Sequence, residues 1–279
     1  MRRPVDRDLP PNLHISSVLP ADHDGFRVDD AAAMKALTEA EDRHFWHRSR
    51  NELIVNRLLS LGAMAGAPVV ELGCGGGAVA AAMSHAGFEV VGVDGHVVRL
   101  REAARRAPNA TFWAHDLSRG AAPVEKAHFA VAALFDVIEH LDDAEAALAD
   151  ALSLVKPGGL LVGTVPALMS LWSNYDEASG HKRRYSRSTL AETLSRVKGA
   201  ALLEILDFNR HLVPMMWLQR RLLSKRLAEG EVLTENLAVP STPVNAALSL
   251  VAGVEQRLRP LLERTHLPGA SLWFALRKD

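Results

Sequence analysis

Short apolar runs alternate with helical patterns through the middle of this 279-residue chain. The apolar runs have the length and the β-branched content of buried strands. In chain order, the predicted strands and helices occupy residues 67–73, 78–87, 88–94, 96–107, 110–116, 128–141, 144–155 and 160–166. This alternation predicts an α/β fold built of βαβ units, in which a parallel sheet carries helices on both faces and the crossovers are right-handed.

The alternation stops after Pro166. A polar loop at residues 170–186 leads to two further predicted strands, 201–210 and 270–278, which are separated by about sixty residues. Strands that close a sheet are usually joined more tightly. We therefore expect a mostly helical insertion at about 211–268, before the last strand.

The N-terminal region has a different composition. Residues 1–30 carry prolines and little apolar periodicity, which predicts an extended or partly disordered arm. Helices are predicted at about 30–43 and 47–61, with one more at 187–197. We expect a single domain at residues 31–279 behind that arm.

Composition limits the classes of function. With 32 basic and 33 acidic residues, the net charge is -1, which argues against a nucleic-acid partner. The single cysteine fits a reducing cytoplasm. The proline-rich start is unlike a signal peptide, and no apolar run approaches the ~20 residues of a transmembrane helix. The 12 histidines and the cysteine show no zinc-ligand spacing, so no metal site is expected.

The stretch VVELGCGGGAVAAAM, residues 69–83, places a glycine turn after the first strand of this alternation. Gly73, Gly75 and Ala78 match the dinucleotide pattern G-x-G-x-x-G/A. A nicotinamide cofactor would place its diphosphate there, near the negative charge of Glu71, which disfavours it. S-adenosylmethionine brings an ammonium and a sulfonium instead, so an acid beside the turn would favour its binding.

Two more acids end the next strands. Asp94 closes 88–94, where a carboxylate can accept both ribose hydroxyls. Asp116 closes 110–116, where it could accept from an adenine amino group. Each acid alone could equally be a helix N-cap. Acids at three successive strand ends favour a nucleoside site.

On these motifs the chain resembles the class I S-adenosylmethionine-dependent methyltransferases. VVELGCGGG, VVGVD, HDL, FDVIEHL and LVKPGGLLVGTVP resemble the family's successive motifs, and the resemblance covers about residues 40–210 and the last ten. It implies a Rossmann-like, doubly wound, seven-stranded sheet of order 3-2-1-4-5-7-6 with an antiparallel last strand. One departure is Ala130, which follows Phe129 where relatives commonly have aspartate.

The resemblance also implies which residues hold the cofactor. An N-terminal segment of similar enzymes folds over the cofactor, and an arginine there meets the methionine carboxylate. The alternative for that segment is an amphipathic helix packing on the sheet. The expected cofactor-binding residues are Trp46, Arg50, Glu71, Gly73, Cys74, Gly75, Gly77, Asp94, Gly95, Asp116, Leu117, Phe135 and Asp136.

Two histidines are candidates for a catalytic base. His140 ends DVIEH, just after the fourth strand, and a histidine can accept a proton near neutral pH. Its alternative roles are cofactor contact or helix capping. His181 lies in the polar loop after the fifth strand, which should overhang the crevice at the carboxyl ends of the strands. The loop's candidates for acceptor binding are Tyr175, Arg183, Arg184 and Tyr185, and its alternative is a solvated basic turn.

The insertion begins with HLVPMMWLQRRLLSKRL, residues 211–227, in which apolar side chains alternate with Arg220, Arg221, Lys225 and Arg226. Such a helix can contact an anionic membrane, cover a substrate or form a homodimer.

Together these features predict methyl transfer from S-adenosylmethionine to an oxygen or nitrogen of a small molecule. Segments HFWHRSR and GHKRRYS resemble a bacterial group whose members often methylate small molecules, sugars or lipid-linked intermediates. The alternatives are a methyltransferase-like binding or assembly module without turnover, and a nicotinamide-dependent oxidoreductase.

Overall fold

The computed structural model describes residues 9–16, 31–119, 122–222, 238–265 and 267–279. Within these ranges the strands form one eight-stranded sheet of order β1-β4-β3-β2-β5-β6-β8-β7. The strands are β1 (Leu13–Ile15), β2 (Pro68–Leu72), β3 (Glu89–Asp94), β4 (Thr111–Ala114), β5 (Phe129–Phe135), β6 (Val155–Pro166), β7 (Ala200–Phe208) and β8 (Ser271–Lys278). β8 runs antiparallel to both β6 and β7, and the other pairs are parallel.

The order β4-β3-β2-β5-β6-β8-β7 corresponds to the predicted 3-2-1-4-5-7-6, and its antiparallel member is the predicted one. The prediction of seven strands is wrong by one, because β1 extends the sheet at its β4 edge. Leu13 is buried there, and the Asn12 amide donates to the carbonyl of Ala110 at 2.9 Å. A three-residue strand in a proline-rich segment has no periodicity by which the sequence could reveal it.

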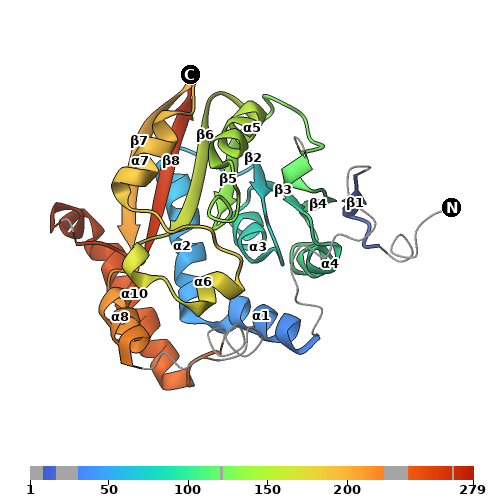
Figure 1. Ribbon diagram of the computed structural model, residues 1–279. Coiled ribbons are helices and arrows are strands. Elements are labelled where there is room, and N and C mark those ends of the chain that lie inside the picture. The colour runs from blue at the N-terminus through green and yellow to red at the C-terminus, as the bar shows by residue number, and fades with distance from the viewer. Residues whose placement is uncertain (1–8, 17–30, 120–121, 223–237, 266) are drawn as a thin grey trace.

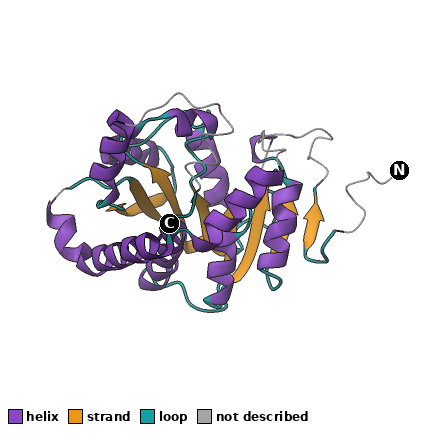
Figure 2. Ribbon diagram, turned by 90° about the horizontal axis from the view of Figure 1, so that it is seen from below, coloured by secondary structure: helices purple, strands orange, loops and turns teal. Residues whose placement is uncertain are grey.

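Helices cover both faces of the sheet (Figures 1 and 2). They are α1 (Ala31–Arg43), α2 (Phe45–Ser60), α3 (Ala78–His85), α4 (Val97–Arg106), α5 (Ala144–Leu154), α6 (Asn174–Ala178), α7 (Arg187–Ser195), α8 (Leu212–Leu222) and α10 (Thr242–Leu262). Buried residues of α2, α3 and α4 share one core with one face of the sheet, and those of α5 and α7 share the core of the other face. Alternate residues of a strand enter opposite cores, as Val69 and Val70 of β2 do.

The described part of the insertion is helical and is attached to α2. Asn245 of α10 accepts the backbone N–H of Phe45 at 2.9 Å, and Gln256 donates to the carbonyl of Ser49 at 2.9 Å. At the base of the insertion, Glu255 accepts the backbone N–H of Arg210 at 2.9 Å. These contacts place α10 beside the N-terminal segment that the sequence links to the cofactor.

Candidate active site

The glycine turn between β2 and α3 lies at the carboxyl end of the parallel strands, where doubly wound sheets bind ligands. Gly73, Gly75 and Gly77 have φ angles of 79°, 51° and 74°. A Cβ on Gly73 would lie 2.5 Å from Val137, and one on Gly77 would lie 2.6 Å from Ala103. The turn therefore requires glycine both for its conformation and for the close approach of its neighbours.

Glu71 at the end of β2 is a buried carboxylate. Its side chain is shut off from solvent, and its Oε2 atom has no hydrogen-bond partner among the described residues. Burial raises the pKa of Glu71 to about 8, although the positive charge of Arg50 opposes the rise. A buried carboxyl oxygen without a partner is costly. A cationic ligand would provide a partner for Oε2.

Asp94 joins the end of β3 to the glycine turn. Its Oδ2 accepts the backbone N–H of Gly75 at 2.8 Å, and its Oδ1 accepts that of His96 at 2.8 Å, across the intervening Gly95. Burial alone would raise the pKa of Asp94, but the hydrogen bonds from His96 and Gly75 lower it below its usual value. The carboxylate is therefore ionised at neutral pH and has the acceptor atoms that ribose hydroxyls require.

An ion pair connects the N-terminal segment to the end of β5. Arg50 of α2 pairs with Asp136, and its guanidinium carbon lies 4.8 Å from the centre of the Trp46 ring. The second oxygen of Asp136 accepts from the Thr164 hydroxyl at 3.1 Å. Asp136 has a φ of 55°, a conformation that few non-glycine residues adopt and that clusters at functional sites. The structure thus brings the predicted Trp46, Arg50 and Asp136 together.

The other predicted cofactor residues are buried or lie at strand ends. Asp116 accepts from the backbone N–H and the hydroxyl of Ser118, at 3.0 Å and 2.7 Å, and so caps the short 3₁₀ turn Leu117–Arg119. Phe135 is buried in the sheet core. Cys74 is buried within the turn, and burial raises the pKa of its thiol well above the usual range. Contact of these residues with the cofactor stays a prediction.

Sequence reasoning missed a cluster above the glycine turn. Glu41 of α1 forms ion pairs with Arg99 and Arg106 of α4, the second at 2.8 Å. Arg106 also donates to the carbonyl of Gly76 at 2.6 Å, and a Cβ on Gly76 would lie 2.8 Å from Glu41. The pattern of α1 alone could not reveal this, because the partners are about sixty residues apart in the sequence. α1 and α4 therefore cover the turn together.

The two predicted catalytic histidines lie side by side. The ring centres of His140 and His181 are 4.8 Å apart, and the rings are nearly perpendicular. His181 Nδ1 lies 2.9 Å from Oδ1 of the buried Asp176. Burial and the neighbouring His181 lower the pKa of His140 to about 4, so its ring is neutral at pH 7. The Tyr175 ring centre lies 6.3 Å from that of His181.

Three of the predicted acceptor-binding residues make contacts inside the protein. Arg184 is buried, and it donates to Asp176 at 2.7 Å and to the Ala167 carbonyl at 3.0 Å. Arg183 donates to the Leu141 carbonyl at 2.9 Å. Tyr185 is buried in the core that contains α7. Their binding to an acceptor stays a prediction, and the structure gives each a supporting role in this loop.

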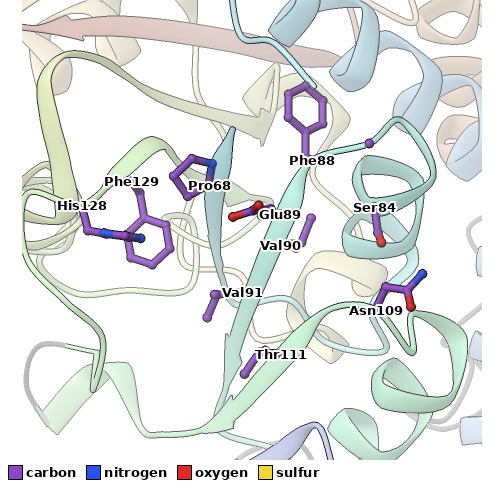
Figure 3. A pocket seen from close by; sticks show the side chains of 11 residues that line it. Pro68, Ser84, Phe88, Glu89, Val90, Val91, Asn109, Thr111, His128 and Phe129 are labelled. Atoms are coloured by element: carbon purple, nitrogen blue, oxygen red, sulfur yellow. The ribbon is translucent and has the colours of Figure 1, made fainter. Parts of the chain in front are cut away.

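A cavity of about 400 Å³ lies at the opposite end of the strands (Figure 3). Its lining includes Pro68, Glu89, Thr111 and Phe129, which are at or near the amino ends of β2 to β5. Parallel sheets of this kind bind ligands at their carboxyl ends. The cavity is therefore separate from the site built around Glu71 and Asp94.

Comparison with known proteins identifies the family of this chain. A methyltransferase domain family matches residues 45–207. The malonyl-[acyl-carrier protein] O-methyltransferase of Pseudescherichia vulneris is 29% identical over 175 residues, which are 61% of this chain and 68% of that protein. The ubiquinone biosynthesis O-methyltransferase of Maricaulis maris is 31% identical over 100 residues, 35% of this chain and only 39% of that enzyme.

Solved structures show the same fold. Geranyl diphosphate methyltransferase in complex with S-adenosylmethionine has a TM-score of 0.57 and 16% identity, covering 91% of this chain and 93% of that one. The phosphoethanolamine N-methyltransferase 2 of Haemonchus contortus, also bound to S-adenosylmethionine, has a TM-score of 0.53 and 21% identity. This chain covers 52% of that protein's chain, and the match spans 82% of this one.

The chain belongs to the methyltransferase domain family, and it is a class I S-adenosylmethionine-dependent methyltransferase. The residues present fit that cofactor. Glu71 leaves a buried oxygen without a protein partner, and the glycine turn leaves a cradle that a Cβ would fill. We expect Glu71 and Asp136 to hold the charged methionine end, Asp94 the ribose and Asp116 the adenine, and these contacts stay predictions.

Among the described residues, none of the helices is both long enough and apolar enough to cross a bilayer. On α8, the exposed Met215, Trp217 and Leu218 belong to the segment predicted to contact a membrane. Lys225 and Arg226 of that segment lie outside the described residues. Peripheral membrane contact, a homodimer and a cytoplasmic location therefore stay predictions.

Proposed function

We propose that this enzyme methylates an oxygen, or less favourably a nitrogen, of a small-molecule acceptor such as a natural product, a sugar or a lipid-linked intermediate. One observation carries the proposal: a residue pair expected to contact the cofactor adjoins the two histidines expected to contact the acceptor. Asp136, paired with Arg50, lies at the end of β5, and His140 follows four residues later beside His181. Both relatives described above are named as O-methyltransferases, which supports oxygen.

The cofactor supplies a methyl group already activated by its sulfonium, so transfer needs alignment more than bond activation. Glu71 and Asp94 would fix the cofactor, and the Arg50–Asp136 pair would orient its methionine end. The loop that carries Tyr175 and His181 would hold the acceptor. Its position depends on the buried Asp176, which binds both His181 and Arg184. That anchoring supports a preorganised acceptor site.

The proposal is tested by turnover with methyl-labelled cofactor and a panel of phenols, catechols, carboxylic acids and amines. Formation of labelled product together with adenosylhomocysteine is the expected result for at least one oxygen acceptor. Binding of adenosylhomocysteine without turnover on any acceptor would favour a binding module. Labelling of amines alone would place the transfer on nitrogen.

Replacing His181 by alanine is expected to slow turnover by at least tenfold, or ~1.4 kcal/mol, while the affinity for adenosylhomocysteine changes little. The reason is that His181 belongs to the loop proposed to hold the acceptor, whereas Glu71 and Asp94 belong to the proposed cofactor site. Turnover rates and calorimetric affinities check both parts, and thermal unfolding verifies the fold. Wild-type turnover in the variant would leave His181 with a structural role only.

A further inference from the structure

Three side chains capable of binding a metal ion converge beside the acceptor loop. They are Glu139 and His140, which follow β5, and His181, which follows α6. One ligand atom from each residue can be chosen so that all three lie within 4.8 Å of one another. A carboxylate with two imidazoles is a donor set that suits divalent transition metals.

Glu139 is the unexplained member of this cluster. Its side chain is 0% exposed, and neither carboxylate oxygen has a hydrogen-bond partner among the residues that the structure describes. A fully buried carboxylate with no partner is rare, and a missing ion is one of its ordinary explanations. The cluster is therefore more than a chance approach of surface groups.

The outer contacts of the two histidines resemble those of metal ligands. His181 Nδ1 lies 2.9 Å from Oδ1 of Asp176, and His140 Nδ1 lies 3.3 Å from the carbonyl of Gly180. Ligating histidines usually donate their other ring N–H to a carboxylate or a carbonyl, which fixes the ring and its tautomer. Both rings therefore have an outer contact of the kind that would fix their orientation around an ion.

Three cations near the cluster are already paired with acids. Arg50 and Arg184 are paired with Asp136 and Asp176 respectively. Lys182, next to His181, is paired with the exposed Asp142. These three pairs reduce the repulsion that a bound cation would meet.

We propose that Glu139, His140 and His181 bind a divalent transition-metal ion of the Zn²⁺, Mn²⁺ or Fe²⁺ class. Bonds of about 2.1 Å hold the ligands of one ion roughly 3.4 Å apart in a tetrahedral site. Binding of an ion would therefore have to draw together ligand atoms that now lie within 4.8 Å of one another. The sequence predicted no metal site because Glu139 and His140 are adjacent and His181 comes forty residues later, which matches no zinc-ligand spacing.

Three protein ligands leave at least one coordination position open. If the proposed function holds, that position would take an oxygen of the acceptor, and the ion would lower the pKa of an acceptor hydroxyl. This part rests on the proposed methyl transfer. Metal binding itself does not, and it is measured without cofactor or acceptor.

The test uses the full chain without a histidine tag, stripped of metal with a chelator and titrated calorimetrically with Zn²⁺. Co²⁺ substitution gives a spectroscopic reading of the ligand field. We expect one ion per chain, and at least tenfold weaker binding in Glu139→Gln and in His181→Ala. His128→Ala, which removes a half-exposed histidine near the start of β5, is the matched control and should bind as wild type.

Absence of stoichiometric Zn²⁺ binding would overturn the proposal, as would equal affinities in all four proteins. Calorimetry with adenosylhomocysteine on the same variants separates the two claims. Intact cofactor binding with no metal binding rejects the metal site and leaves the methyltransferase assignment standing. Metal binding that the variants lose, in a protein without turnover, supports the metal site alone.

Discussion

Glu71→Gln is expected to raise the free energy of unfolding by roughly 3 kcal/mol at pH 7. Burial raises the pKa of Glu71 to about 8 in the folded protein, whereas an exposed glutamate ionises near pH 4.5. Above pH 4.5 the unfolded chain gains stability by losing this proton before the folded chain does. Each pKa unit of difference is worth ~1.4 kcal/mol, so wild-type stability falls between about pH 4.5 and pH 8. Glutamine has no ionisable proton, so the variant does not lose stability over this pH range.

Urea unfolding of both proteins at pH 5 and pH 8 measures this effect. The difference between variant and wild type should be small at pH 5 and should grow to several kcal/mol at pH 8. A constant difference between the two pH values would mean that Glu71 ionises normally in the folded state.

The same substitution is expected to weaken cofactor binding. If the ionised carboxylate holds the ligand's ammonium group, wild-type affinity for adenosylhomocysteine should rise about tenfold per pH unit below pH 8 and then level off. The Glu71→Gln protein should lack this rise. Any pH dependence that remains in its affinity comes from ionisation of the ligand itself. Calorimetry at pH 6, 7 and 8 gives both curves. Parallel curves would remove Glu71 from the binding site.

Asp94→Ala is expected to weaken the binding of adenosylhomocysteine by at least tenfold, or ~1.4 kcal/mol. The substitution removes the acceptor for the ribose hydroxyls and the hydrogen bond that holds Gly75 at 2.8 Å. Glu125→Ala, which removes an exposed carboxylate before β5, is the matched control and should bind normally. Unchanged affinity in Asp94→Ala would exclude this residue from the site.

The separate apolar runs and the helical patterns between them were sufficient to predict a parallel α/β sheet, whereas the order of its strands came from the family resemblance. β1 escaped prediction because its stability depends on the edge of β4 and on Asn12 capping α4, contacts that are remote in sequence. The KPGG sequence at residues 156–159 is typical of a turn. In the structure these residues are an irregular part of β6 next to β5.

The candidate site also contains residues whose location the sequence could predict and residues whose location it could not. Glu71, Asp94 and the glycines follow predicted strands directly, so their common location followed from the topology. The Glu41–Arg99–Arg106 cluster and the approach of Glu139 to His181 depend on how loops and helices pack above the sheet. Arg184 shows the opposite case. Its charge suggested ligand binding, yet its guanidinium is buried against Asp176.

The central claim is that the carboxylates ending β2 and β3 form a site for a cationic nucleoside ligand and not for a diphosphate. Calorimetry of the wild-type protein with adenosylhomocysteine and with NAD, in parallel, tests it most directly. The account predicts micromolar or tighter binding of adenosylhomocysteine and no measurable binding of NAD. Binding of NAD with no response to adenosylhomocysteine would contradict it.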